Sequence, residues 1–166
     1  MSKLSHIDDS GRATMVDVGQ KPVTTREAVA EARVRFPPDV YAELRAAGFT
    51  GRKGSLTETA RLAGVMAAKR TSELIPLCHP LALNYVDVAI LPEDDAHGLH
   101  LTCTARCTGK TGVEMEALTG VTVAALTVYD MAKALSHDIE VQRVRLVRKT
   151  GGKSDVGSLS AKPTTP

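Results

Sequence analysis

The sequence of 166 residues contains no tryptophan, and aromatic residues amount to only 3% of it. Proteins that bind single-stranded nucleic acid use aromatic side chains as stacking platforms, so this class of function is disfavoured. The formal net charge is only +2, which argues against a general nucleic-acid or membrane-surface binder. We therefore expect no nucleic-acid or membrane partner, and any bound anion must be held by a local cluster of Lys and Arg.

Long uncharged apolar runs are also missing. No stretch of about 18 apolar residues occurs, so no membrane span is expected. The first residues, MSKLSHIDDSGRA, have no apolar segment of the kind found in secretory signals. Cysteine is scarce, and the odd count of Cys78, Cys103 and Cys107 favours reduced thiols in a cytoplasmic protein.

What the sequence does contain is enough for one domain. Apolar residues make up 43% of the chain and charged residues 24%, which is near the globular average. Because aromatics are few, the core must be built from Ala, Val and Leu. We expect a single domain over residues 1–154, with a flexible arm at 1–12 and a mobile polar tail at 155–166.

Two periodicities alternate along the chain. Alternation with period two predicts strands at 24–36, 83–92, 98–107 and 139–149, and helical spacing predicts helices at 39–48, 51–74 and 111–136. This order predicts an α+β fold, a ferredoxin-like sandwich whose antiparallel sheet carries its helices on one face. The third helix is apolar nearly all round, which favours an oligomer.

The segment RCTGKTG at 106–112 contains the Gly-Lys-Thr of a phosphate-binding loop. A Walker A loop needs a second Gly separated from this triplet by four residues, but Thr104 occupies that position inside a predicted strand. We therefore interpret GKTG as a turn that enters a helix. Lys110 is then either simply exposed or close to an anion that the helix N-terminus attracts.

His97, His100, Cys103 and Cys107 have a spacing close to that of a zinc quartet. In a strand, however, the two cysteines lie about 13 Å apart, which is too far for both sulfurs to bind one zinc ion. His100 also points to the opposite face from Cys103. We expect no metal site here, but two buried core thiols and two polar histidines.

The segment IPLCHPL at 75–81 carries Cys78 and His79 between prolines. It is either a rigid wall of a site or a kinked linker with a satisfied histidine. A nucleophilic Cys-His pair is disfavoured, because neighbouring side chains in an extended chain point apart. Basic residues that could converge on a polyphosphate, or could be solvated surface charges, are Arg26, Arg52, Lys53, Lys69, Arg70, Arg148, Lys149 and Lys153.

The apolar third helix carries four charges. Glu114 is expected to reach solvent at the helix start, whereas Glu116, Asp130 and Lys133 share one sector of the helix. Charges on so apolar a helix are costly unless they are paired or used. Glu116 and Asp130 are separated by about 21 Å along the helix. The two ends therefore serve two sites, or each site is completed by a second subunit.

Four segments together resemble the cyclic pyranopterin monophosphate synthase family, the accessory protein C family of molybdenum cofactor biosynthesis. They are TMVDVGQKPVTTREAVA, AAKRTSELIPLCHPL, TGKTGVEMEALTGVTVAALTVYDMAKA and RKTGGKS, and the resemblance covers about residues 4–154. It implies a lyase that converts 3',8-cyclo-7,8-dihydro-GTP to cyclic pyranopterin monophosphate and releases pyrophosphate. It also implies a radical SAM GTP cyclase as functional partner and a homo-hexamer, a trimer of dimers with sites between subunits.

The resemblance further implies roles for individual residues. Asp130 matches a general base, and Lys53 and Lys133 match basic active-site positions that donate protons and offset charge. The implied substrate-binding residues are Leu77, Cys78, His79, Met115, Glu116, Arg26, Lys69, Lys149 and Lys153. No protein-bound metal is expected, although Mg²⁺ could accompany the substrate phosphates. A nucleotide-binding domain without chemistry, a zinc module and a structural oligomer stay open as alternatives.

Overall fold

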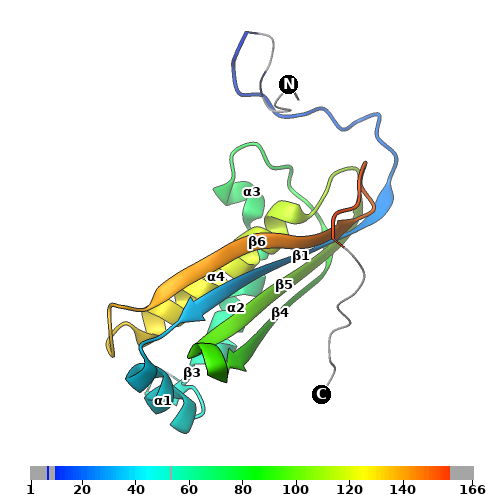
Figure 1. The fold of residues 1–166 in the computed structure, drawn as a ribbon. Coiled ribbons are helices and arrows are strands. Elements are labelled where there is room, and N and C mark those ends of the chain that lie inside the picture. Colours follow the sequence, from blue (N-terminus) through cyan, green and yellow to red (C-terminus); the bar gives the residue numbers. More distant parts are fainter. Residues whose placement is uncertain (1–6, 8–9, 53, 158–166) are drawn as a thin grey trace.

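The structure, a computed structural model, describes residues 7, 10–52 and 54–157. Its elements are β1 (Thr24–Arg35), α1 (Pro38–Ala46), β2 (Thr50–Gly51), β3 (Gly54–Ser55), α2 (Leu56–Ala68), α3 (Thr71–Leu74), β4 (Leu83–Glu93), the 3₁₀ turn η1 (Asp94–Ala96), β5 (Gly98–Gly109), α4 (Glu114–Ala132) and β6 (Glu140–Thr150). Figure 1 shows α2 and α4 side by side against one face of the main sheet. The predicted α+β fold with an antiparallel sheet and helices on one face is confirmed.

The main sheet has four strands in the order β4-β5-β1-β6, and all neighbours are antiparallel. With α2 and α4 as the crossovers, this is the strand-helix-strand, strand-helix-strand path of a ferredoxin-like fold. β1 pairs with β5 from Thr24 opposite Gly109 to Arg35 opposite Gly98, and Ala28 lies opposite Lys149 of β6. The start of β1 and the ends of β5 and β6 therefore meet at one end of the sheet.

The core between sheet and helices is built from small side chains. Ala28, Ala30 and Ala32 of β1 are buried, and α2 and α4 approach each other at Gly64 and Gly120. A Cβ atom on Gly120 would lie 2.6 Å from the Cys103 sulfur, so this position requires glycine. Close packing of small residues is how a chain with so few aromatics fills its core.

The cysteines of β5 lie in this core, as the sequence predicts. Cys103 and Cys107 are both buried on the helix-facing side of the strand. Burial raises the pKa of Cys103 to about 12 and also raises that of Cys107. On the opposite face of β5, the His100 ring lies 2.9 Å from the Glu31 carboxylate, so it is the polar histidine expected there.

The predicted helix over 51–74 is not continuous. Its first residues form the short β2–β3 hairpin, after which Ser55 caps α2 by accepting a hydrogen bond from the Glu58 amide at 3.2 Å. α2 ends at Ala68, whose carbonyl accepts a hydrogen bond from the buried hydroxyl of Thr71, the first residue of α3. The sequence did not reveal this break, because the helical spacing of its apolar residues continues across it.

The predicted arm and tail are described only in part. Ile7 pairs with Ala13, and Val156 pairs with Lys149 at the end of β6, so the first residues of the predicted tail are attached to the sheet. The other predicted arm and tail positions at 1–6, 8–9 and 158–166 lie outside the described residues, as does Lys53. None of the described helices is long and apolar enough to cross a membrane.

Candidate active site

A cleft opens where the start of β1, the end of β5, the start of α4 and the end of β6 meet. It consists of two adjoining pockets of about 370 Å³ and 420 Å³. Both pockets are lined by Lys21, Thr111, Gly112, Glu114 and Lys153, so they form one continuous hollow. We call this hollow the α4 cleft, because the first turn of α4 separates its two halves.

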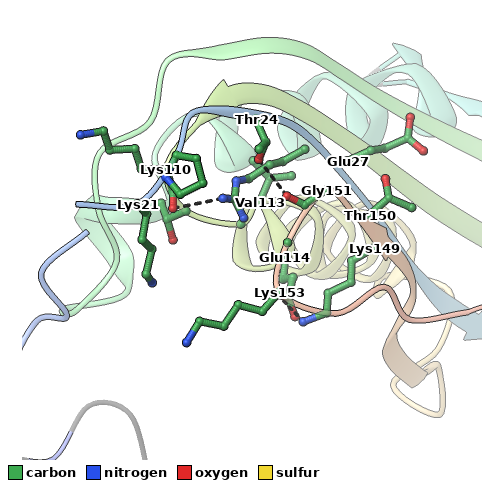
Figure 2. Close-up of a pocket in the computed structure, with 15 residues that line it drawn as sticks. Lys21, Thr24, Glu27, Lys110, Val113, Glu114, Lys149, Thr150, Gly151 and Lys153 are labelled. Carbon is green, nitrogen blue, oxygen red and sulfur yellow. Dashed lines mark hydrogen bonds and ion pairs between the residues drawn. The ribbon is translucent and has the colours of Figure 1, made fainter. Parts of the chain in front are cut away.

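The first half of the α4 cleft is strongly basic. Among the residues that line it, five are cationic and two are carboxylates. The cations are Lys21, Arg26, Lys110, Lys149 and Lys153. The first amide groups of α4 lie at the same place, and a helix N-terminus favours negative charge. This half has the chemistry of a site for a phosphate chain (Figure 2).

Arg26 and Lys149 are held in place by the elements around them. Only 9% of Arg26 is exposed, and its Nε donates to the Gly109 carbonyl at 3.0 Å. Its Nη2 donates to the Lys110 carbonyl at 3.3 Å, which fixes the GKTG turn against β1. The Lys149 ammonium donates to the Glu114 carboxylate at 2.9 Å. Both cations are thus oriented by the fold toward the start of α4.

Glu114 reaches solvent at the start of α4, as the sequence predicts, with 37% of its side chain exposed. It also lines both pockets and pairs with Lys149 (Figure 2), which was not predicted. The sequence did not reveal this pair, because the two residues are 35 positions apart and belong to different elements. Glu114 therefore belongs to the α4 cleft and reduces its positive charge.

The second half of the cleft is mostly apolar and contains the predicted residues of the 75–81 segment. The residues that line it include Leu77, Cys78, His79, Leu81, Met115 and Glu116. Only 4% of Glu116 is exposed, and burial raises the pKa of its carboxyl group. A pocket that combines apolar side chains with a buried carboxyl group suits a flat heterocycle with hydrogen-bonding groups on one edge.

The segment 75–81 forms a wall of this pocket, as one of the two interpretations of the sequence predicts. The Cys78 amide donates to the Ile75 carbonyl at 3.0 Å, which closes a tight turn before His79. Burial, and secondly the charge of Glu116, raise the pKa of the Cys78 thiol. A thiol with a raised pKa is a poor nucleophile, which supports the view that Cys78 and His79 are not a nucleophilic pair.

The other predicted catalytic residues lie at the opposite end of α4. Asp130 and Lys133 form an ion pair of 2.6 Å, and both side chains are more than half exposed. The bond to Asp130 raises the pKa of Lys133. Fourteen helical residues, about 21 Å, separate Asp130 from Glu116. The fold of one protomer therefore does not bring Asp130 or Lys133 to the α4 cleft.

Lys53 and Lys69 are the remaining predicted cations. Lys53 lies outside the described residues, between Gly51 of β2 and Gly54 of β3. Lys69 is the exposed C-cap of α2 and is not among the described residues that line the cleft. The sequence analysis missed Lys21, which lines both pockets. Its position could have revealed it, because Lys21 is a cation that shortly precedes β1, and β1 begins at the cleft.

A comparison of the sequence with models of known families identifies the family of this chain. The model of the MoaC family matches residues 15–152, a range that includes every described residue of the α4 cleft except Lys153. The chain belongs to the MoaC family. The resemblance inferred from the four sequence segments is thereby confirmed.

The sequences of curated relatives match this chain over nearly their whole length. A protein of Xanthomonas oryzae pv. oryzae is 56% identical over 160 residues, which is 95% of this chain and 94% of the relative. One of Xanthomonas campestris pv. campestris is 55% identical over 157 residues with the same coverage. One of Brucella ovis is 53% identical over 152 residues, 92% of this chain and 91% of the relative. Each is named cyclic pyranopterin monophosphate synthase.

Proposed function

We propose that the protein is a lyase that converts 3',8-cyclo-7,8-dihydro-GTP to cyclic pyranopterin monophosphate and releases pyrophosphate, in molybdenum cofactor biosynthesis. The observation that carries this proposal is the 56% identity, over 94% of its length, to a relative named cyclic pyranopterin monophosphate synthase. The α4 cleft supports it, because a basic half beside an apolar half fits a triphosphate attached to a guanine-derived ring system.

The substrate is proposed to lie along the cleft. Arg26, Lys149 and Lys153 would hold the triphosphate, and Lys69 stays a proposed further contact. The ring system would contact Leu77, Cys78, His79, Met115 and Glu116 in the apolar half. The Glu116 carboxylate would accept N–H bonds from the guanine-derived edge, and such bonds lower a carboxyl pKa that burial has raised.

The phosphoryl step requires a base and charge stabilisation. A ribose-derived hydroxyl oxygen attacks the α-phosphorus, a new P–O bond forms, and the bond to the bridging oxygen breaks as pyrophosphate leaves. Asp130 is proposed to accept the hydroxyl proton as general base. Lys53 and Lys133 are proposed to donate a proton during ring opening and to offset the charge that develops on phosphate.

This chemistry requires a second subunit. Asp130 and Lys133 are exposed and about 21 Å along α4 from Glu116, so we propose that each site joins the α4 cleft of one protomer to the opposite helix end of its partner. The assembly is proposed to be a homo-hexamer, a trimer of dimers. Exposed apolar side chains on α2 and α4, including Leu62, Met66 and Leu126, support association.

No resident metal is proposed. The described residues contain no group of three or more His, Cys, Asp or Glu side chains that could hold a metal ion. Mg²⁺ is proposed to enter with the substrate phosphates, which is its usual mode of binding in nucleotide enzymes. The substrate is proposed to come from a radical SAM GTP cyclase, and the protein to be cytoplasmic, where buried thiols such as Cys103 stay reduced.

The test is turnover of purified substrate, followed by pyrophosphate release, for the wild type, Lys53→Ala and Asp130→Asn. We expect the wild type to turn over, and both variants to bind substrate but to release pyrophosphate at least about a hundredfold more slowly. A wild-type protein that binds the substrate without releasing pyrophosphate would instead indicate a nucleotide-binding domain without chemistry.

A further inference from the structure

The segment of residues 16–22, which we call the strap, lies along the α4 cleft. It has no helix or strand of its own. Val16 and Val18 line the apolar half, Pro22 lines the basic half, and Lys21 lines both. The strap therefore contributes side chains to both halves of the cleft, although it lies outside the sheet and helix layers.

The strap is folded into a turn by its own backbone. The Lys21 amide donates to the Val18 carbonyl at 3.1 Å. The Gly19 amide donates to the Asp17 carboxylate at 2.7 Å. These two bonds fix the shape of the turn, but they do not attach it to the rest of the cleft.

Lys110 makes that attachment. Its ammonium donates to the Gly19 carbonyl at 2.5 Å, across 91 positions of sequence. The backbone of Lys110 is itself fixed, because its carbonyl accepts a bond from Arg26 Nη2. Lys110 thus joins the turn before α4 to the strap, and its charge is directed at a carbonyl of the strap.

Lys21 is in a different situation. Within residues 10–52 and 54–157, its ammonium has no hydrogen-bond or ion-pair partner, although the residue is partly buried. It lines both pockets, as Lys153 does, and Figure 2 shows both side chains in the basic half. A cation held there by a backbone turn is available for an anionic ligand.

We propose that Lys110 is a positioning residue, which holds the strap over the α4 cleft so that Lys21 contacts the phosphate chain of the ligand. The ligand class rests on the proposed function, but the positioning does not depend on the lyase reaction. Lys110 acts through Lys21 in this proposal, so removal of both side chains has no more effect than removal of Lys21 alone.

The test is a double-mutant cycle with inorganic triphosphate as the probe, measured by titration calorimetry on the full chain. Lys21→Gln and Lys110→Gln are each expected to weaken binding about tenfold, and the double variant is expected to be no weaker than Lys21→Gln. Lys110→Arg is expected to restore most of the affinity. Arg35→Gln removes one exposed charge at the far end of β1 and is expected to change affinity less than about twofold.

Two further readouts separate positioning from direct contact. Hydrogen exchange of the strap amides is expected to speed up in Lys110→Gln and to keep the wild-type rate in Lys21→Gln. With the full substrate, Lys110→Gln is expected to raise KM about tenfold and to change kcat much less.

Additive losses in the double variant, or strap exchange unchanged in Lys110→Gln, would overturn the proposal, and so would an equal loss in Arg35→Gln. If the wild type released no pyrophosphate while the cycle behaved as expected, the proposed reaction would fail and the positioning role would stand.

Discussion

The two ends of α4 differ in how completely they are built. At its start, Glu114 and Glu116 lie in a cleft with walls from β1, β6, the turn after β5 and the 75–81 segment. At its end, Asp130 and Lys133 form an exposed ion pair on the surface. Exposed ion pairs contribute little to the free energy of unfolding. Stabilisation of the fold therefore does not explain why so apolar a helix carries Asp130 and Lys133.

This difference indicates that the functions of one site are divided between the two ends of α4. The start of α4 has burial and charge that suit ligand binding, whereas its end carries an exposed carboxylate and an exposed ammonium group. In the twofold arrangement proposed above, the start of α4 of one subunit would meet the end of α4 of its partner, and each would supply groups that the other lacks. The predictions below test this division, beginning with the largest expected effect.

The first prediction is recovery of activity by mixing inactive variants. Asp130→Asn is expected to lose about a thousandfold in kcat, and Glu116→Gln about a hundredfold in kcat/KM. If the variants are mixed in equal amounts and reassociated, one site of each mixed dimer carries neither substitution. About a quarter of wild-type activity should therefore return, measured as pyrophosphate release at low substrate concentration.

The matched control mixes Asp130→Asn with Lys133→Gln. Both substitutions then lie at the same end of α4, so each site of a mixed dimer contains one of them and no recovery is expected. Recovery in the control, or none in the first mixture, would show that both helix ends do not serve one site shared by two subunits.

The second prediction concerns the basic half of the cleft. Lys149→Gln is expected to raise KM about tenfold, because it removes a cation proposed to hold the triphosphate. Glu114→Gln, which releases Lys149 from its 2.9 Å ion pair, is expected to lower KM. Steady-state kinetics of the two variants measure both effects. A rise of KM in Glu114→Gln would mean that this carboxylate contacts the substrate itself.

The third prediction concerns Glu116, whose carboxyl pKa is raised by burial. A carboxyl whose folded-state pKa is raised gives stability that is present below its unfolded pKa and is lost as pH rises through the folded value. Glu116→Gln should therefore unfold at a higher temperature than the wild type at pH 7, despite its lower activity.

Thermal unfolding at pH 7 and at pH 4 measures this effect. The advantage of Glu116→Gln should shrink at the lower pH, where the wild-type carboxyl is protonated. A variant less stable than the wild type at pH 7 would indicate that Glu116 is stabilised as a carboxylate by its surroundings.

The sequence predicted the fold better than it predicted the cleft. Period-two alternation located all four strands of the main sheet, because their buried faces carry small apolar residues such as Ala30 and Ala32. Helical spacing placed Glu116 and Asp130 on one helix, at positions too far apart for one ligand. These predictions needed only the local period and the rise of a helix.

The side-chain contacts between different elements could not be predicted from the sequence. The pairs Lys149 with Glu114 and Lys110 with Gly19 join residues that no period connects. They depend on which strand ends meet, and that depends on the register of β1 with β5 and β6. The roles of Lys53, Asp130 and the other proposed site residues stay predictions until the variants are measured.

The last and smallest prediction concerns the sheet face that carries no helices. Arg106 lies there, with Nε 2.5 Å from the Glu27 carboxylate and its guanidinium 4.7 Å from the centre of the Tyr85 ring. Because its side chain is about half exposed, Arg106→Gln is expected to change stability by less than about 1 kcal/mol, and kcat/KM less than about twofold.

Chemical unfolding, kinetics and sedimentation of Arg106→Gln measure these effects together. Unchanged mass and activity would leave the outer surface of α2 and α4, with its exposed Leu62 and Met66, as the better candidate for contact between subunits. A variant that dissociates and loses activity would instead place the interface on the open sheet face. The partner's Asp130 would then have to reach the α4 cleft around the sheet edge, along the side where β6 and Lys149 lie.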